Sequence, residues 1–377
     1  MSDNSVQGGS PPADVPVYIS SSPHIGSPVD TGQLMSRVIL ALTPVSIFGI
    51  VLYGVPALFT ILVSVTAAEL AELLFRKIIR KDIRNGDLSA VVTGLLLALI
   101  LPPSTPLWIT ALGSIFAIVV AKEFFGGLGA NVFNPALAGR AFLLMSFPVA
   151  ITTWTLPKIF LGADIFVAPV DIVSGPTTLG AIKLGDAITG AGIGPAVVSF
   201  GTGSHFWINF GNYLLGFRGG SIGESSIILI VAGFVFLLAT GTIDWRAPVS
   251  MVLSVFVFSF LFGKDPLFAI LSGGALFGAV FMTTDYVTAP FTSIGKLVFG
   301  FFAGLITVII RRWGNFPEGV TYSILIMNAF TPFLNRLLQK KYGYVKPQKA
   351  KVPKETAAVT GDSAAGGTVG GTAGGTK

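Results

Sequence analysis

The chain has 377 residues, of which 52% are hydrophobic and only 11% are charged. Soluble globular proteins carry about 25% charged residues, so this chain cannot cover its apolar side chains with a water-facing surface, and the composition indicates a membrane protein. The formal net charge of +6 does not indicate a nucleic-acid-binding surface, because the basic residues cluster where predicted membrane spans end.

Two residue types limit the chemistry of the chain. Cysteine is absent, which excludes disulfides, thiolate iron–sulfur clusters and Cys-ligated metals. The two histidines, His24 and His205, are too few and too far apart for a His-based metal site. We therefore predict no metal site and no catalytic side chain, and any redox chemistry requires an organic cofactor or a metal held by a partner.

Apolar runs divide the chain into five regions. Residues 1–36 are polar, rich in Ser, Pro and Gly, and lack the features of a signal peptide, so we expect the first apolar run to be an uncleaved span. We predict an all-α polytopic membrane protein with about ten transmembrane helices. Five are expected within 37–150, at 38–53, 56–75, 88–101, 107–121 and 134–150. Five more are expected within 226–339, at 226–240, 248–262, 267–282, 294–310 and 320–338.

The two remaining regions lack a predicted span. Residues 151–225 are rich in Gly, Thr, Pro and Asp, and we expect them to form an extramembrane segment. The tail, 340–377, begins with basic residues and becomes a low-complexity run of Gly, Thr and Ala, which has nothing to bury and should be disordered.

Basic residues predict the orientation of the chain. Five Lys or Arg residues lie within 76–84, after the second span, and five lie within 340–351. Loops rich in Lys and Arg face the cytoplasm, so we expect both termini inside and residues 151–225 on the periplasmic side. Arg311 and Arg312 then fall outside, against this rule.

The two halves of the chain are similar to one another. The spans at 88–101 and 267–282 are each followed by a Pro-containing segment, a short apolar span and a Gly-rich loop. The separation of about 190 residues, with five spans in each half, predicts two inverted repeats and a site at the interface between them. The alternative is that these are ordinary spans with Pro-capped ends.

Several charged residues lie within or beside predicted spans. Glu69 and Glu72 are three residues apart on the second span. They could form a proton or Na⁺ relay, or they could pair with Arg76 and Lys77 near the cytoplasmic interface. Lys122 and Glu123 end the fourth span, and Arg140 lies within the fifth, where Glu123 is one possible partner.

The segment 171–179, DIVSGPTTL, is the most informative motif. Its Ser, Gly and Pro residues predict an exposed turn. It resembles the D-x-x-S-G-A-T flavinylation motif of a family that contains the Rnf D subunit and the B subunit of the Na⁺-translocating NADH:quinone oxidoreductase. Asp171, Ser174, Gly175 and Thr177 match in register, and Pro176 replaces the usual alanine.

Further segments extend the resemblance over about residues 35 to 340. These segments are residues 86–90, together with 101–103 later in the sequence, residues 131–140, and residues 282–290. The resemblance implies a urea-transporter-like fold of ten spans in two inverted five-helix repeats.

The resemblance also implies FMN bound covalently through a phosphoester to Thr177, with Asp171, Ser174 and Gly175 recognised as part of the motif. Other candidate cofactor-binding residues are Thr178, Asn134, Arg140 and Asp285, with Arg140 a possible ligand of a flavin phosphate. A second, non-covalent flavin such as riboflavin could bind between the halves.

The resemblance implies an inner-membrane component of an ion-translocating electron-transport complex. Such a component passes electrons between ferredoxin and NAD through its flavin while the complex moves Na⁺ or H⁺. The implied partners are membrane lipid, a flavin transferase, and the other Rnf subunits, especially the G subunit, which carries covalent FMN, and the A and E subunits, which lie in the membrane. The short polar N-terminus favours the Rnf D subunit over the B subunit of the quinone reductase. A flavin-free transporter of small solutes and a cofactor-free assembly protein are alternatives from other classes.

Overall fold

Apolar runs of the sequence form helices in the computed structural model, which describes residues 30–81, 86–155, 174–175, 210–211, 214–216, 219–314 and 318–338. Within these ranges the elements of secondary structure are helices apart from two short strands, β1 (Trp154–Thr155) and β2 (Ser174–Gly175). The expected all-α class is therefore confirmed in its main feature, whereas the disordered tail that we predict lies outside the described residues.

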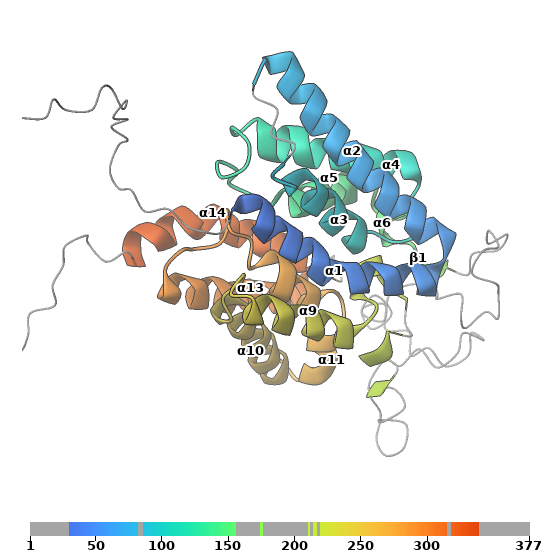
Figure 1. Ribbon diagram of the computed structural model, residues 1–377. Coiled ribbons are helices and arrows are strands. Elements are labelled where there is room, and N and C mark those ends of the chain that lie inside the picture. Colours follow the sequence, from blue (N-terminus) through green and yellow to red (C-terminus); the bar gives the residue numbers. More distant parts are fainter. Residues whose placement is uncertain are drawn as a thin grey trace, which may run out of the picture. The chain divides into compact units, whose positions relative to one another are not determined.

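The first half of the chain contains α1 to α6 (Figure 1). The fourth helix continues directly into a π-helical turn, η1. The elements are α1 (Thr31–Tyr53), α2 (Val55–Ile79), α3 (Ser89–Ile100), α4 (Leu107–Ile118), η1 (Val119–Glu123), α5 (Pro135–Ser146) and α6 (Pro148–Thr152).

The second half begins with a 3-10 turn, η3 (Ile222–Glu224). Its third predicted span is not one helix but three consecutive pieces with a break after the first. The elements that follow η3 are α9 (Ile227–Ala239), α10 (Arg246–Leu261), α11 (Pro266–Leu271), α12 (Ala275–Phe277), η4 (Gly278–Met282), α13 (Ser293–Trp313) and α14 (Val320–Leu338).

Local sequence explains where several helices begin. Asn134 caps α5 by accepting a hydrogen bond from the Leu137 amide at 3.2 Å, and Pro135 occupies the first helical position. Asp265 caps α11 in the same way, again followed by proline. Thr292 caps α13 by accepting from the Gly295 amide at 3.1 Å.

Three predicted spans differ from the structure. The first begins at Thr31 rather than Val38, so the helix includes residues assigned to the polar N-terminus. The span predicted at 134–150 is interrupted at Phe147, because Pro148 cannot continue the hydrogen-bonding pattern of α5. The span predicted at 267–282 is interrupted between α11 and α12 by Ser272, Gly273 and Gly274.

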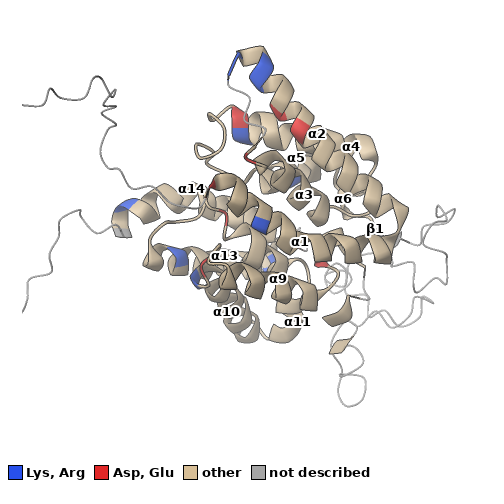
Figure 2. Cartoon of the chain, in the orientation of Figure 1, with Lys and Arg blue, Asp and Glu red and all other residues tan. Residues whose placement is uncertain are grey.

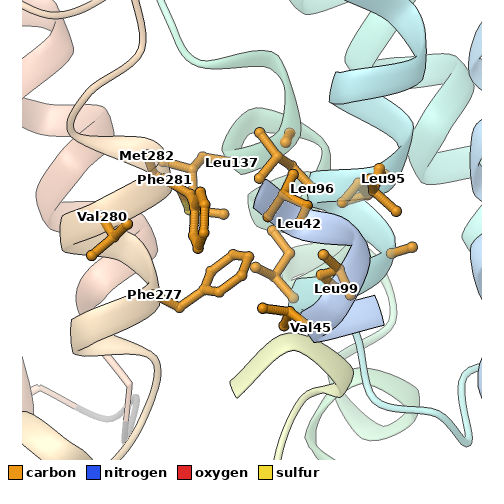
Figure 3. Packing of buried hydrophobic residues seen from close by; sticks show 14 of the residues in the cluster. Leu42, Val45, Leu95, Leu96, Leu99, Leu137, Phe277, Val280, Phe281 and Met282 are labelled. Carbon is orange, nitrogen blue, oxygen red and sulfur yellow. The ribbon is translucent and has the colours of Figure 1, made fainter. Parts of the chain in front are cut away.

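One hydrophobic core joins the two halves. Figure 3 shows Phe277 and Phe281, from α12 and η4, opposite Leu42, Leu96 and Leu99 of α1 and α3. All five side chains are buried. The helices α1 and α9 pack against each other, and so do α5 and α14, so each half completes the core of the other.

Small residues bring α10 and α13 into close contact. Gly300 and Gly304 face the α10 backbone, where a Cβ atom would overlap carbonyl oxygens. Ser250 and Ser254 donate hydrogen bonds to α13 carbonyl oxygens at 2.7 Å. Small residues and hydroxyl bridges are the typical means of packing helices in lipid, where apolar contact with a neighbouring helix is no better than contact with acyl chains.

Candidate functional site

A pocket lies between the two halves of the chain. Its volume is about 70 Å³, and its wall is mostly apolar with polar side chains from both halves. The first half contributes residues of α1, α3, η1 and the start of α5, and the second half contributes residues of α9, η4 and the segment after η4. The polar lining residues are Ser89, Thr93, Lys122, Asn131, Asn134, Thr284, Asp285 and Tyr286.

Asn134 and Asp285 meet in this pocket. The Asn134 amide Nδ2 donates to Asp285 Oδ2 at 3.3 Å, although the residues are 151 positions apart. Thr288 donates to the same carboxylate oxygen at 2.9 Å, and the Val287 amide donates to the other oxygen at 3.3 Å. Two residues that the sequence motifs indicated separately as cofactor candidates therefore form one polar group on the pocket wall.

A cluster of four charged residues includes one lining residue of the pocket, Lys122. This ion cluster comprises Glu72 and Arg76 of α2 and Lys122 and Glu123 of η1. The Lys122 ammonium is 2.8 Å from Glu72 Oε2, and Arg76 Nη2 is 2.7 Å from Glu72 Oε1 and 2.9 Å from Glu123 Oε1. Each charge has an opposite partner, which is the condition for burying ions in an apolar environment.

Lys122 connects the ion cluster to the pocket. Its side chain is 1% exposed, and it also donates to the Ser89 hydroxyl at 2.6 Å. Ser89 in turn donates to Asp87 at 2.7 Å. Both Lys122 and Ser89 line the pocket, so a fixed positive charge lies beside its apolar wall.

The structure separates the two glutamates of α2. Glu72 is buried in the ion cluster, whereas Glu69 is exposed, so they do not share an environment. The predicted pairing of Glu72 with Arg76 is confirmed, but Lys122 rather than the exposed Lys77 is its second basic partner. The π-helical turn places Lys122 against α2, and no periodicity of the sequence reveals such a turn.

Glu123, one possible partner of Arg140 in the sequence, is not its partner in the structure. Arg140 forms an ion pair with Glu318, which precedes α14, and Glu123 pairs with Arg76. Arg140 is outside the residues that line the pocket. The Arg140–Glu318 pair links the two halves, and Glu318 was missed in the sequence because nothing in its local pattern distinguishes it from a solvated loop residue.

The segment 171–179, which resembles a flavinylation motif, is described only at Ser174 and Gly175. These residues form β2, which pairs antiparallel with β1 in the register Trp154 to Gly175 and Thr155 to Ser174. The Ser104 hydroxyl donates to the Thr153 carbonyl at 2.9 Å, which attaches the chain before β1 to the Pro-rich loop after α3. Asp171, Thr177 and Thr178 lie outside the described residues.

The pocket offers polar groups to a bound molecule. Amide, carboxylate and ammonium groups line it, and the Asn131 Oδ1 atom is buried without a hydrogen-bond partner among the described residues. The volume of about 70 Å³ is well below the roughly 300–1,000 Å³ of typical ligand pockets. A ring system as large as isoalloxazine therefore does not fit unless the pocket widens.

Large apolar side chains remain exposed on the described helices, and Figure 2 shows few charged residues on them. Three of these helices, α1, α2 and α13, are long and apolar enough to cross a membrane. A helical body with an apolar exterior and a small buried polar site defines a helical membrane protein.

Comparison with known proteins identifies the family. Residues 18–343 match the NQR2, RnfD, RnfE family, and the chain belongs to it. It is 41% identical to the D subunit of the proton-translocating ferredoxin:NAD(+) oxidoreductase complex of Clostridium ljungdahlii, over 86% of this chain and 96% of the relative. It is 39% identical to the D subunit of the Na(+)-translocating ferredoxin:NAD(+) oxidoreductase complex of Acetobacterium woodii, over 88% of this chain and 96% of the relative. The family expected from the sequence motifs is confirmed.

Proposed function

We propose that this chain is the D-type membrane component of an ion-translocating ferredoxin:NAD oxidoreductase. The observation that carries this proposal is similarity over nearly the whole length of relatives that are named as such subunits. The names of these relatives include both proton-translocating and Na(+)-translocating complexes, so similarity to them leaves the coupling ion open. The G, A and E subunits are the proposed neighbours of this chain in the complex.

The proposed electron carrier of this chain is FMN esterified to Thr177. The match of Asp171, Ser174, Gly175 and Thr177 to the flavinylation motif supports this assignment. FMN accepts one or two electrons when it is bound, which suits exchange between one-electron and two-electron carriers. A covalent link prevents loss of the cofactor, and its charged phosphate is better tolerated in a polar segment than in hydrocarbon.

Flavin content tests this function directly. The full chain is purified alone after expression with its flavin transferase and precipitated with acid, and flavin is measured in the pellet and the supernatant. The G subunit is left out because the resemblance implies that it carries covalent FMN of its own. Covalent flavin stays with the precipitated chain, whereas non-covalent flavin is released. A colourless pellet would exclude the covalent cofactor and favour a flavin-free transporter.

A second flavin, bound without a covalent link, is proposed for the pocket between the halves. Asp285 and Asn134 support it, since their polar atoms can hold a ring edge after the pocket widens. We expect Asp285→Ala to lose most of the acid-released flavin and to keep the covalent flavin. Asp30→Ala, which alters an exposed aspartate that lies outside the pocket and makes no capping hydrogen bond, should keep both. If Asp285→Ala released the same amount of flavin in acid as the unaltered chain, the pocket would be excluded as the site of the second flavin.

The proposed architecture is ten spans in two inverted repeats. Packing within each half supports it, because α2 packs against α4 as α10 packs against α13. The proposed location is the inner membrane, with both termini cytoplasmic and residues 151–225 periplasmic, from the distribution of Lys and Arg.

Reporter fusions test this orientation. A reporter that is active only in the periplasm should be active when it is fused after Gly190 and inactive when it is fused after Asn85. The reverse pattern would place the flavinylation motif in the cytoplasm and overturn the proposed orientation.

A further inference from the structure

The break between α11 and α12 leaves carbonyl groups without helical partners. Helix α11 ends at Leu271, and Gly273 and Gly274 both adopt left-handed backbone conformations, with φ of 64° and 67°. The backbone turns there before α12 begins at Ala275. Carbonyl groups at a helix end carry partial negative charge and need a donor or a cation when water is excluded.

Arg311 meets these carbonyl groups from the last turn of α13. Its Nη1 atom donates to the Ala269 carbonyl at 2.6 Å, and its Nη2 atom donates to the Ser272 and Gly273 carbonyls at 3.1 and 3.0 Å. One guanidinium group therefore gathers three carbonyl oxygens. The neighbouring Arg312 is exposed, so the two arginines have different environments.

Acidic groups complete the surroundings of this guanidinium. Glu224 and Glu318 both interact electrostatically with Arg311. The Glu224 carboxylate packs directly against Gly274, where a Cβ atom would overlap it, so the glycine admits the acid to the break. Three carbonyl oxygens with nearby carboxylates form the kind of oxygen-rich surroundings that bind cations at broken membrane helices.

We propose that the break between α11 and α12 is a monovalent-cation site that the guanidinium of Arg311 occupies permanently. Because this guanidinium is covalently part of the chain, it keeps the broken helix in one conformation whether or not a free coupling ion is present. The same segment continues through η4 to Asp285, so Arg311 is a positioning residue for this side of the pocket. Its role also explains why a basic residue at this end of α13 does not follow the positive-inside rule, since its charge is used within the fold.

Guanidinium rescue tests the proposal. Purified complexes with Arg311→Ala and with Arg312→Ala are heated in choline chloride, sodium chloride or guanidinium chloride at equal low millimolar concentrations. We expect Arg311→Ala to unfold several degrees below the unaltered complex in choline chloride and to recover most of that loss in guanidinium chloride. Arg312→Ala should show neither effect. Recovery in sodium chloride would also support a monovalent-cation site, whereas no recovery with either cation would overturn the proposal.

A thiol at the break provides a second measurement that does not depend on thermal stability. The chain has no cysteine, so Ser272→Cys introduces its only thiol. In the unaltered background this thiol should not react with a cationic methanethiosulfonate reagent, and with Arg311→Ala it should react unless guanidinium is present. Reaction of Ser272→Cys while Arg311 is in place would show an open break and contradict the proposal. Neither measurement depends on flavin, so failure of the cation-site proposal is distinguishable from failure of the proposed function.

Discussion

Replacing Thr177 with alanine is expected to remove all fluorescence of the chain on a denaturing gel under ultraviolet light. Thr177 occupies the position of the modified residue in the resembled motif, in register with Asp171, Ser174 and Gly175. Without its hydroxyl no phosphoester bond can form, so the effect should be complete rather than partial. The chain must be expressed with its flavin transferase, and the amount of protein is measured by staining the same gel.

The adjacent Thr178 provides the matched control. Thr178→Ala removes a hydroxyl one residue away and should leave the band fluorescent. A fluorescent Thr177→Ala band together with a dark Thr178→Ala band would move the attachment by one residue and keep the function. A dark band from the unaltered chain, with the transferase present, would contradict covalent attachment altogether.

Lys122→Met is expected to destabilise the protein severely. The substitution keeps much of the side-chain volume but leaves Glu72 with only Arg76 and leaves the Ser89 hydroxyl without its ammonium partner. Removing one member of a buried ion cluster costs about 3–5 kcal/mol, because the remaining charge stays buried without compensation. Thermal unfolding of the purified complex, followed by size-exclusion chromatography, should show a large loss of stability or of assembled protein.

Two further variants separate charge from packing in this experiment. Lys77→Met changes an exposed lysine of α2 and should be close to unaltered. Glu72→Gln combined with Lys122→Met restores charge balance and should be more stable than Lys122→Met alone. If Lys122→Met were as stable as Lys77→Met, the ion cluster would not stabilise the fold.

Apolar patterning predicts most helices of this chain but not how they are interrupted. The run 267–282 has the composition of an ordinary span, and the carbonyl groups at its break bond to Arg311, which comes from a later helix. The early start of α1 was missed because its first turn is polar. Helices α10 and α13 lie close to their predicted bounds, since apolar residues continue along their whole length.

The candidate site was predicted in part. Motif resemblance indicated Asn134 and Asp285, which the structure brings together, and patterning identified Glu72 and Arg76 as a possible pair. The partners Lys122 to Glu72 and Arg140 to Glu318 could not be predicted, because they join residues 50 and 178 positions apart. Such contacts depend on tertiary packing, which a single sequence does not display as a local pattern.

Electron transfer through the FMN on Thr177 is the central proposal for this chain. The most direct test compares the intact complex carrying Thr177→Ala with that carrying Thr178→Ala, in membrane vesicles supplied with reduced ferredoxin and NAD⁺. We predict that Thr177→Ala loses NAD⁺ reduction and the ion uptake coupled to it, while Thr178→Ala keeps both. NAD⁺ reduction and ion uptake at the unaltered rate in Thr177→Ala, with the chain assembled in normal amount, would contradict the proposal.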